Sequence, residues 1–198
     1  MIGNDIVDLK LAQSQSNWKR PRYLDKIFTR KEQGYITNST EKEQMVWRLW
    51  SMKESAYKLY TQCYPSRFYN PKRFECYIEK QSGTVKFKDF ECYVNSKITE
   101  DYVLSEASFE KKSMTSKVLQ FENESVKTKS RILKAKVLKS VTQAHSIPKK
   151  QFEILKDNFG IPSIDLGTHK LNLSLSHHGR FGAYVIGNSV IPRQIETL

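Results

Sequence analysis

Nine residues at positions 50–58, WSMKESAYK, combine an acid and a base at a spacing that suits phosphate chemistry. Glu54 and Lys58 are four residues apart, so in a helix they lie one turn apart on one face. The carboxylate there could bind a metal ion, and the ammonium group could bind a phosphate. The alternative is an ordinary Glu–Lys pair on a solvated face, which contributes only about 0.2–0.5 kcal/mol.

The surrounding residues predict the helix that this spacing requires. No Gly or Pro occurs between Lys42 and Tyr60, and apolar residues recur there at steps of three and four. A second stripe, next to the apolar one, carries two tryptophans together with the acid and the base, which indicates that this face is not simply solvated. The predicted buried stripe is Met45, Leu49, Met52, Ala56 and Leu59, and the second stripe is Trp47, Trp50, Ser51, Glu54 and Lys58.

A further acid lies in the N-terminal segment GNDIVD at positions 3–8, which predicts a short strand. Alternation puts Asp5 on the face of Val7 and Asp8 on the opposite face. A buried carboxylate needs a cation or hydrogen-bond donors. If Asp5 and Glu54 converge, they form the sparse carboxylate pair that suits Mg²⁺, which keeps waters and takes oxygens from substrate phosphates. The alternative is that Asp5 is a turn or capping residue.

The segment LSLSHHGRF at positions 173–181 predicts a strand that turns at Gly179. Neighbouring residues of a strand point to opposite faces, so His177 and His178 are not expected to bind one metal together. Ser176 and His177 could donate hydrogen bonds to a phosphate or a base, whereas a structural histidine is the alternative. A Ser-His-Asp hydrolase would need a nucleophile elbow, and the sequence has none.

Composition limits the classes of protein to which these residues can belong. The chain has 198 residues, of which 38% are hydrophobic and 12% aromatic, and this indicates a globular fold. No apolar run approaches the roughly 20 residues that span a bilayer, and acids occur where a signal peptide carries bases. We therefore expect a cytoplasmic protein without membrane contact. The three cysteines have no metal-site spacing, so we expect reduced core thiols.

The net charge of +12 indicates an acidic partner. It is concentrated in residues 111–150, which hold eleven Lys and Arg against two acids. Such a block can bind nucleic acid or be a solvated helix face. The stretch lacks the interleaved aromatic residues that stack on single strands, so we do not expect nucleic acid. A phosphorylated small molecule or an acidic protein fits the charge equally well.

An internal echo predicts two similar lobes. PKRFECYI at 71–78 resembles PKKQFEIL at 148–155, and GTV at 83–85 is matched by GIP at 160–162, both near a 77-residue offset. Such self-similarity indicates duplication, with a chance match as the alternative. We predict an α+β fold with two pseudo-symmetric lobes, 1–112 and 113–198, each with a long helix packed on a small antiparallel sheet.

The elements of the two lobes are expected in the same order. The first helix covers 42–60, and strands follow at 73–80, 84–94 and 101–108. The second helix covers 124–145, and strands follow at 151–157, 162–166 and 170–187, the last broken near Gly179. The inward stripe of the second helix is Val126, Leu133, Val137, Val141 and Ala144, and Pro148 marks its end.

Taken together, the motifs resemble those of the 4'-phosphopantetheinyl transferase superfamily, and the resemblance extends over most of the chain. The W-S-x-K-E-S-x-x-K run after an upstream G-x-D strand is highly specific for that family. The order of the motifs, with the acid strand first and S-x-S-H near the C-terminus, resembles that of the short branch, the trimeric holo-(acyl carrier protein) synthases. The length and the repeat resemble the two-lobed, surfactin-synthetase-activating branch. The segments that carry the resemblance are GNDIVD (3–8), FTRKE (28–32), WSMKESAYK (50–58) and NLSLSH (172–177).

The resemblance implies an enzyme that moves phosphopantetheine from coenzyme A to a serine of an acidic apo acyl or peptidyl carrier protein, releasing adenosine 3',5'-bisphosphate. It implies that Asp5 and Glu54 bind Mg²⁺, and that Lys58, assisted by Lys53, holds the pyrophosphate. Glu54 or a metal-bound water would take the serine proton. The residues expected to hold the adenosine 3'-phosphate are Ser176, His177, Lys129 and Arg131.

This sequence departs from the family pattern in two places. Val7 stands where the two-lobed branch usually has a second acid, and Ile161 replaces a phosphate-contacting lysine of a G-K-P turn. We therefore expect a water in place of the third protein ligand to the metal, and another base in place of the lysine. We expect a monomer whose lobes are in swapped order through circular permutation, with fatty-acid synthesis as one pathway for the carrier. The alternative from another class is a basic module that binds nucleic acid or acidic proteins without catalysis.

Overall fold

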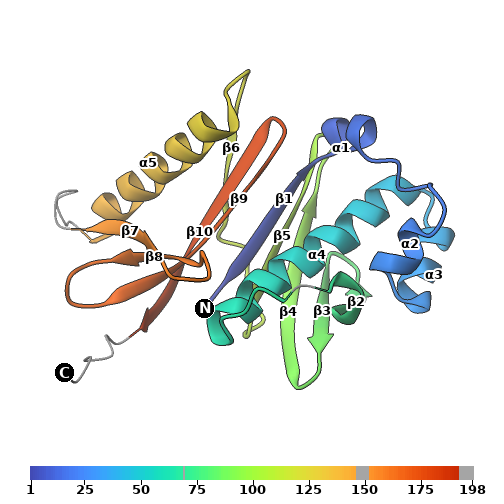
Figure 1. The fold of residues 1–198 in the computed structure, drawn as a ribbon, viewed down its shortest axis with the longest axis horizontal. Coiled ribbons are helices and arrows are strands. Elements are labelled where there is room, and N and C mark those ends of the chain that lie inside the picture. Colours follow the sequence, from blue (N-terminus) through green and yellow to red (C-terminus); the bar gives the residue numbers. More distant parts are fainter. Residues whose placement is uncertain (69, 146–151, 192–198) are drawn as a thin grey trace.

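The computed structural model describes residues 1–68, 70–145 and 152–191, and their architecture is α+β, as predicted (Figure 1). Two five-stranded antiparallel sheets carry helices. The first sheet has the order β1-β5-β4-β3-β2, and the second has the order β6-β10-β9-β8-β7. The strands are β1 (Gly3–Asp8), β2 (Glu75–Glu79), β3 (Ser82–Phe87), β4 (Phe90–Ile98), β5 (Tyr102–Ser108), β6 (Lys117–Gln120), β7 (Glu153–Lys156), β8 (Pro162–Asp165), β9 (Lys170–His178) and β10 (Phe181–Ile191).

The two halves of the chain repeat one topology. In each half, one strand is followed by a long helix and then by four strands, and the first strand pairs with the last. The sequence echo fits this repeat, because β2 and β7 occupy equivalent places and overlap the two echoed segments. Part of the second copy, residues 148–151, lies outside the described residues, as does the predicted helix end at Pro148. The predicted lobe boundary at 112/113 falls in the link between β5 and β6 and remains a prediction.

Two details of the predicted strands are wrong. The run predicted over 84–94 is a hairpin of β3 and β4, which turns at Lys88 with a φ of 52°. The apolar pattern continues through this turn, so periodicity alone does not locate it. Strand β6 was not predicted, since its four residues carry a short pattern beside a charged segment. The predicted break near Gly179 is confirmed as the turn between β9 and β10.

The helices comprise α1 (Leu9–Gln15), α2 (Tyr23–Ile27), α3 (Arg30–Asn38), α4 (Lys42–Cys63) and α5 (Val126–His145), together with the short 3₁₀ helix η1 (Pro71–Arg73). Helix α4 lies on the first sheet and buries its predicted stripe completely from Leu49 to Leu59, although Met45 is half-buried. Its opposite faces are also largely covered, and even Arg48 and Lys53 are buried. The possibility of a simple solvated face therefore does not apply to most of this helix.

Helix α5 covers the second sheet with the middle of its predicted stripe. Leu133, Val137 and Val141 are buried, as expected. The two ends of the stripe are predicted wrongly, because Val126 is 68% exposed and Ala144 is also exposed. Both lie in the terminal turns, away from the helix centre that packs on β9 and β10. Among the described residues, no helix combines the length and apolar character needed to cross a membrane.

Strand β1 runs through the middle of the molecule, between β5 of its own sheet and strands β9 and β10 of the other (Figure 1). A small apolar cluster of Ile6, Leu104, Phe181 and Ala183 fills this seam. Polar contacts cross it as well, since the Asn4 N–H donates to Ser174 Oγ at 2.9 Å. The seam brings the N-terminal strand against the SLSHH strand, 170 residues further along the chain.

Candidate active site between the two sheets

Asp5 on β1 and Lys58 on α4 form an ion pair beside the seam. Lys58 Nζ donates to Asp5 Oδ1 at 3.0 Å and to the Asn4 carbonyl oxygen at 2.9 Å. The strand and helix approach closely because residue 3 is glycine: a Cβ there would lie 2.1 Å from the Ser55 carbonyl oxygen. The close approach of strand and helix thus brings the acid within reach of the base.

The surroundings of Asp5 favour a bound cation. Its side chain is 13% exposed, and that of Lys58 is 28% exposed. Burial raises the pKa of Asp5, while the positive charge of Lys58 opposes this increase. A carboxylate in this position is stabilised by any additional cation that reaches it.

Glu54 and Asp5 line the same hollow, of about 560 Å³, which we call the acid pocket. Its walls come from three parts of the chain: α4 with Trp47 and Trp50, β1 with α1 and α2, and the end of β9 with His177. The structure therefore brings together three residues that the sequence analysis selected separately, Asp5, Glu54 and His177.

His177 also borders a second hollow, of about 930 Å³, which we call the basic groove and which follows α5. Arg131 and Lys134 line this groove together with the apolar Leu138. Burial lowers the pKa of His177, and the positive charges of Lys129 and Lys58 add to this effect. A neutral imidazole at this position can still donate one N–H to an anion.

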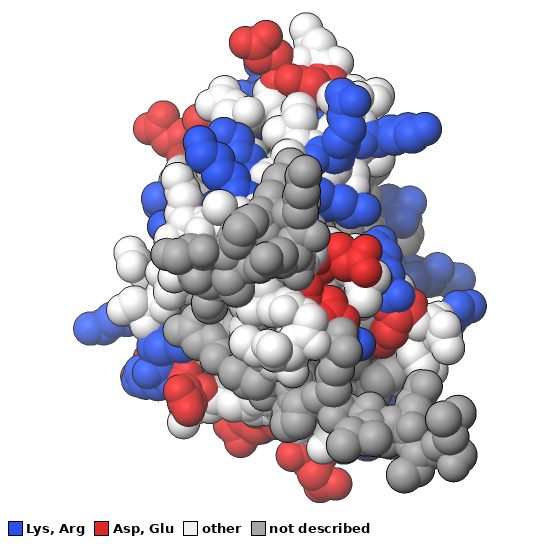
Figure 2. All heavy atoms as spheres, turned by 90° about the vertical axis from the view of Figure 1, so that its left-hand side faces the viewer, with Lys and Arg blue, Asp and Glu red and all other residues white. Residues whose placement is uncertain are grey.

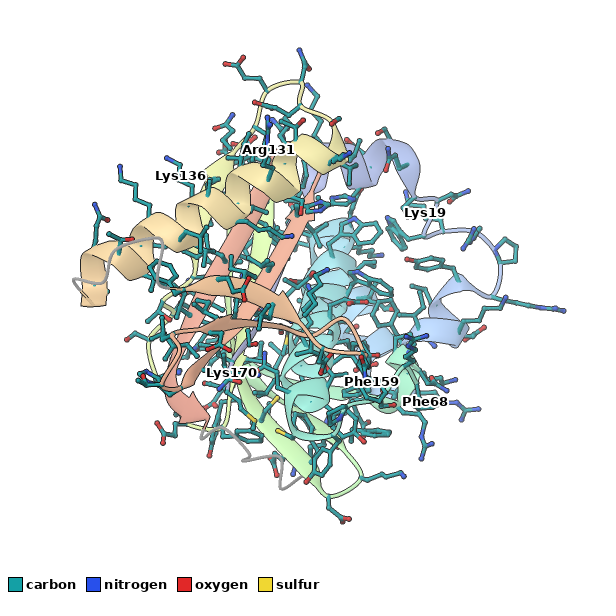
Figure 3. All side chains as sticks on the ribbon, turned by 60° about the vertical axis from the view of Figure 1, so that its left-hand side comes forward. Lys19, Phe68, Arg131, Lys136, Phe159 and Lys170 are labelled. Atoms are coloured by element: carbon teal, nitrogen blue, oxygen red, sulfur yellow. The ribbon has the colours of Figure 1, made fainter. Side chains whose placement is uncertain are left out.

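Figure 2 shows the face that carries α5, with Lys and Arg side chains over its upper part and a few acids among them. In Figure 3, Arg131 and Lys136 lie along α5, and Lys136 projects away from the protein body. Both side chains are exposed. The helix therefore presents Arg131 and Lys134 at the groove and Lys136 to solvent.

Two other predicted phosphate ligands are positioned differently from His177. Lys129 Nζ donates to the Gly179 carbonyl oxygen at 2.6 Å, so it holds the β9–β10 turn. Ser176 points to the face opposite His177, is 7% exposed, and its hydroxyl has no hydrogen-bond partner within the described residues. The structure thus places Arg131 and His177 at the groove, whereas Lys129 and Ser176 are not among the residues that line it.

Lys53, predicted to assist Lys58, lies inside the protein. Its side chain is 0% exposed, and Nζ donates to Glu32 Oε1 at 2.6 Å and to the Phe74 carbonyl oxygen at 2.6 Å. The same Glu32 oxygen accepts the Cys76 N–H, and Oε2 accepts the Thr29 N–H, each at 2.7 Å. The FTRKE and WSMKESAYK segments are therefore joined by a buried ion pair, and in this arrangement Lys53 does not reach the acid pocket.

The sequence patterns assign no role to Asp8, but the structure gives it several contacts. Its Oδ1 accepts the N–H groups of Lys10 and Leu11, which caps α1, and it also binds the guanidinium group of Arg180. Burial opposes ionisation, yet the hydrogen bonds from Arg180 and Leu11 outweigh it and lower the pKa of Asp8 to about 2. An Asp directly before a helix is a capping signal, so part of this role was visible in the sequence.

A third hollow, of about 250 Å³, lies at the Gly160–Pro162 turn, and we call it the turn pocket. Lys58, Lys156 and Ile161 are among the residues that line it. The loops around it touch across the two halves, since Arg67 donates to the Asn158 carbonyl oxygen at 3.0 Å. Phe68 and Phe159, both about half exposed, lie close together in Figure 3. Lys58 thus contacts Asp5 on one side and borders the turn pocket on the other.

The donor set fits a sparsely ligated magnesium ion. Within the part of the chain that the structure describes, no group of three or more His, Cys, Asp or Glu side chains has metal-site geometry. Asp5 and Glu54 nevertheless offer two carboxylates to one pocket, and Asp5 already attracts a cation in Lys58. Oxygen ligands in this number suit Mg²⁺, which retains water and binds substrate phosphates.

The fold and the pocket together define an α+β protein with an acid pair, a lysine and a histidine between two sheets. A comparison with protein families finds that residues 1–107, more than half of the chain, match the family model of the 4'-phosphopantetheinyl transferase superfamily. The chain belongs to this superfamily. A search of curated proteins gives no significant match.

Proposed function

We propose that the chain transfers the 4'-phosphopantetheine group from coenzyme A to a serine hydroxyl of a carrier protein. The observation that supports this most strongly is the meeting of Asp5 and Glu54 with His177 in the acid pocket. The two acids lie inside the family match, whereas His177 lies outside it. Residues of both halves are therefore available to one substrate that carries several phosphates.

In this proposal, Asp5 and Glu54 hold Mg²⁺, which when bound neutralises charge on the coenzyme A pyrophosphate. Lys58 binds a pyrophosphate oxygen. Two of its three N–H bonds go to Asn4 and Asp5, which leaves the third for the substrate. Phosphoryl transfer depends mainly on such charge neutralisation and alignment.

Glu54 accepts the proton of the carrier serine, because a general base must lie within hydrogen-bond reach of its substrate. The serine Oγ bonds to the phosphorus that carries pantetheine, and the bond from this phosphorus to the bridging oxygen breaks. The electron pair leaves with adenosine 3',5'-bisphosphate. Glu54 is half-buried and lines the acid pocket, where we propose that this step occurs.

The adenosine 3'-phosphate is proposed to lie between His177 and Arg131 at the basic groove, where Lys134 supplies further charge. Lys129 supports this site indirectly, by holding the turn that follows His177. Lys156 is our candidate for the base that substitutes for the family lysine at Ile161, because it pairs with Pro162 and lines the turn pocket.

The acidic carrier protein is proposed to contact the exposed cations of α5. Lys136 is the sharper test residue, because it projects to solvent while Lys134 borders the groove. We further propose a monomer in which the circularly permuted halves supply both sides of the site. Mass measurement in solution checks this, and an obligate trimer would instead support the short branch of the family.

The experiment for the proposed function measures release of adenosine 3',5'-bisphosphate from coenzyme A. We expect release only when apo carrier protein and Mg²⁺ are both present, and its loss with EDTA and in Glu54→Gln. Glu43→Gln, at another half-buried glutamate of α4, is the matched control and should keep activity. Release that is independent of carrier, or that persists in Glu54→Gln, would contradict the proposal.

A further inference from the structure

Asp8, in the first half of the chain, binds the turn between β9 and β10 in the second half. Asp8 Oδ2 accepts the backbone N–H of Arg180 at 2.8 Å and its Nε–H at 3.0 Å, and Oδ1 accepts from NH2 at 2.9 Å. Its side chain is 1% exposed. Such a bidentate, charge-assisted contact is both strong and geometrically specific. We call this set of contacts between Asp8 and residues 178–180 the clasp.

The backbone at Asp8 and the backbone at Gly179 both favour the clasp. The Asp8 N–H donates to His178 Nδ1 at 3.0 Å. Gly179 has a φ of 54°, and a Cβ there would lie 2.3 Å from Asp8 Oδ2. Glycine is therefore required both by the conformation of the turn and by the space that the carboxylate occupies.

The same turn is also bound by other residues of the second half. Lys129 Nζ donates to the Gly179 carbonyl oxygen at 2.6 Å, and the Phe121 N–H donates to the Arg180 carbonyl oxygen at 2.7 Å. The clasp therefore connects β1, which carries Asp5, to the Gly179–Arg180 turn, which begins two residues after His177 and is held by α5 through Lys129. Movement of this turn would shift His177 relative to the two acids.

We propose that Asp8 is a positioning residue for phosphopantetheinyl transfer, setting the distance between the acid pair and the phosphate-binding side of the pocket. This inference rests on the proposed function. Coenzyme A would span both halves, with its pyrophosphate at Asp5 and Glu54 and its 3'-phosphate at His177. A displacement of about 1 Å between such groups can lower the rate about 100-fold. A ligand held by the second half alone should not respond to the clasp.

Asp8→Asn tests this with little other disturbance, because asparagine also caps helices and α1 keeps its N-cap. Binding is measured by calorimetry with two probes, coenzyme A with Mg²⁺ and adenosine 3'-monophosphate. We expect each of the single variants Asp8→Asn and Arg180→Gln to weaken coenzyme A binding and to lower kcat, with a combined effect of about 10- to 100-fold. Binding of adenosine 3'-monophosphate should be unchanged in both variants. Asp101→Asn is the control, since its 62% exposed side chain contacts the same guanidinium group at 3.3 Å, and should behave as wild type.

The outcomes separate the clasp from the proposed function. The double variant Asp8→Asn/Arg180→Gln should be no worse than either single variant, because both remove one contact. Wild-type coenzyme A binding and kcat in Asp8→Asn would overturn the clasp alone. Equal losses of affinity for both probes, together with a smaller fraction of binding-competent molecules, would show that the contact is purely structural. This result would also overturn the positioning role of the clasp. A wild-type chain that neither binds coenzyme A nor modifies carrier would overturn the proposed function, and the role of the clasp with it.

Discussion

Lys53→Met should destabilise the protein strongly, even though Lys53 lies beside Glu54 in the sequence. Lys53 and Glu32 are both 0% exposed and 2.6 Å apart. Removing the ammonium group would leave the buried Glu32 carboxylate without its positively charged partner, although the carboxylate would still accept the backbone N–H groups of Cys76 and Thr29. Breaking such a pair costs about 3–5 kcal/mol, a large part of the roughly 5–15 kcal/mol that stabilises a typical domain.

The assay is urea unfolding followed by tryptophan fluorescence, together with transfer activity per folded molecule. Lys58→Met is the matched control on the same helix: its side chain is 28% exposed, so we expect a smaller loss of stability but loss of transfer. Glu32→Gln in the Lys53→Met background should recover part of the stability, because it removes the unpaired charge and keeps the capping position. A Lys53→Met protein with wild-type stability and no transfer would refute the structural assignment of Lys53.

Three further predictions concern Gly179, Asp8 and Lys136. Gly179→Ala should destabilise the protein by about 2 kcal/mol or more, because alanine is strained at a φ of 54° and its Cβ would collide with Asp8. Gly34→Ala is the control, because a Cβ there meets nothing within 4 Å, and it should stabilise α3 by about 0.5–1 kcal/mol in the same urea titration. The pKa of Asp8 is lowered from 3.8 to about 2, so its contribution of about 2 kcal/mol is complete above pH 5 and declines as the pH falls. The stability difference between wild type and Asp8→Asn should therefore shrink by about 1 kcal/mol from pH 6 to pH 3, and a constant difference would contradict this. Lys136→Glu should raise the KM for carrier protein and leave that for coenzyme A nearly unchanged; equal effects on both would refute carrier contact at α5.

Local sequence patterns predicted those features that depend on neighbouring residues. The spacing of Leu49, Met52, Ala56 and Leu59 predicted the buried stripe of α4, and all four are 0% exposed. The sequence echo predicted the repeated topology, because equivalent strands need similar apolar patterns. Three separate sequence segments also identified Asp5, Glu54 and His177, which meet at the acid pocket. The alternation of residues did not show that β1 is buried along its whole length.

Long-range contacts account for what the sequence did not predict. Lys53 follows Met52 and precedes Glu54, and nothing local reveals that its partner is Glu32, 21 residues earlier. The contacts of Asp8 with Arg180 span 172 residues. Ser176 could not be distinguished from His177 as a phosphate ligand without knowing which face of β9 meets β1. In each case, the partner is supplied by packing between elements that are far apart in the chain.

The most direct test of the proposed function is the intact mass of an apo carrier protein after incubation with this chain, coenzyme A and Mg²⁺. We predict a gain of one phosphopantetheine group at the carrier serine, absent when that serine is alanine and when the enzyme carries Asp5→Asn or Glu54→Gln. The Glu43→Gln enzyme should give the same gain as wild type. No mass gain on any apo carrier, or an unchanged gain with both pocket acids neutralised, would contradict the account.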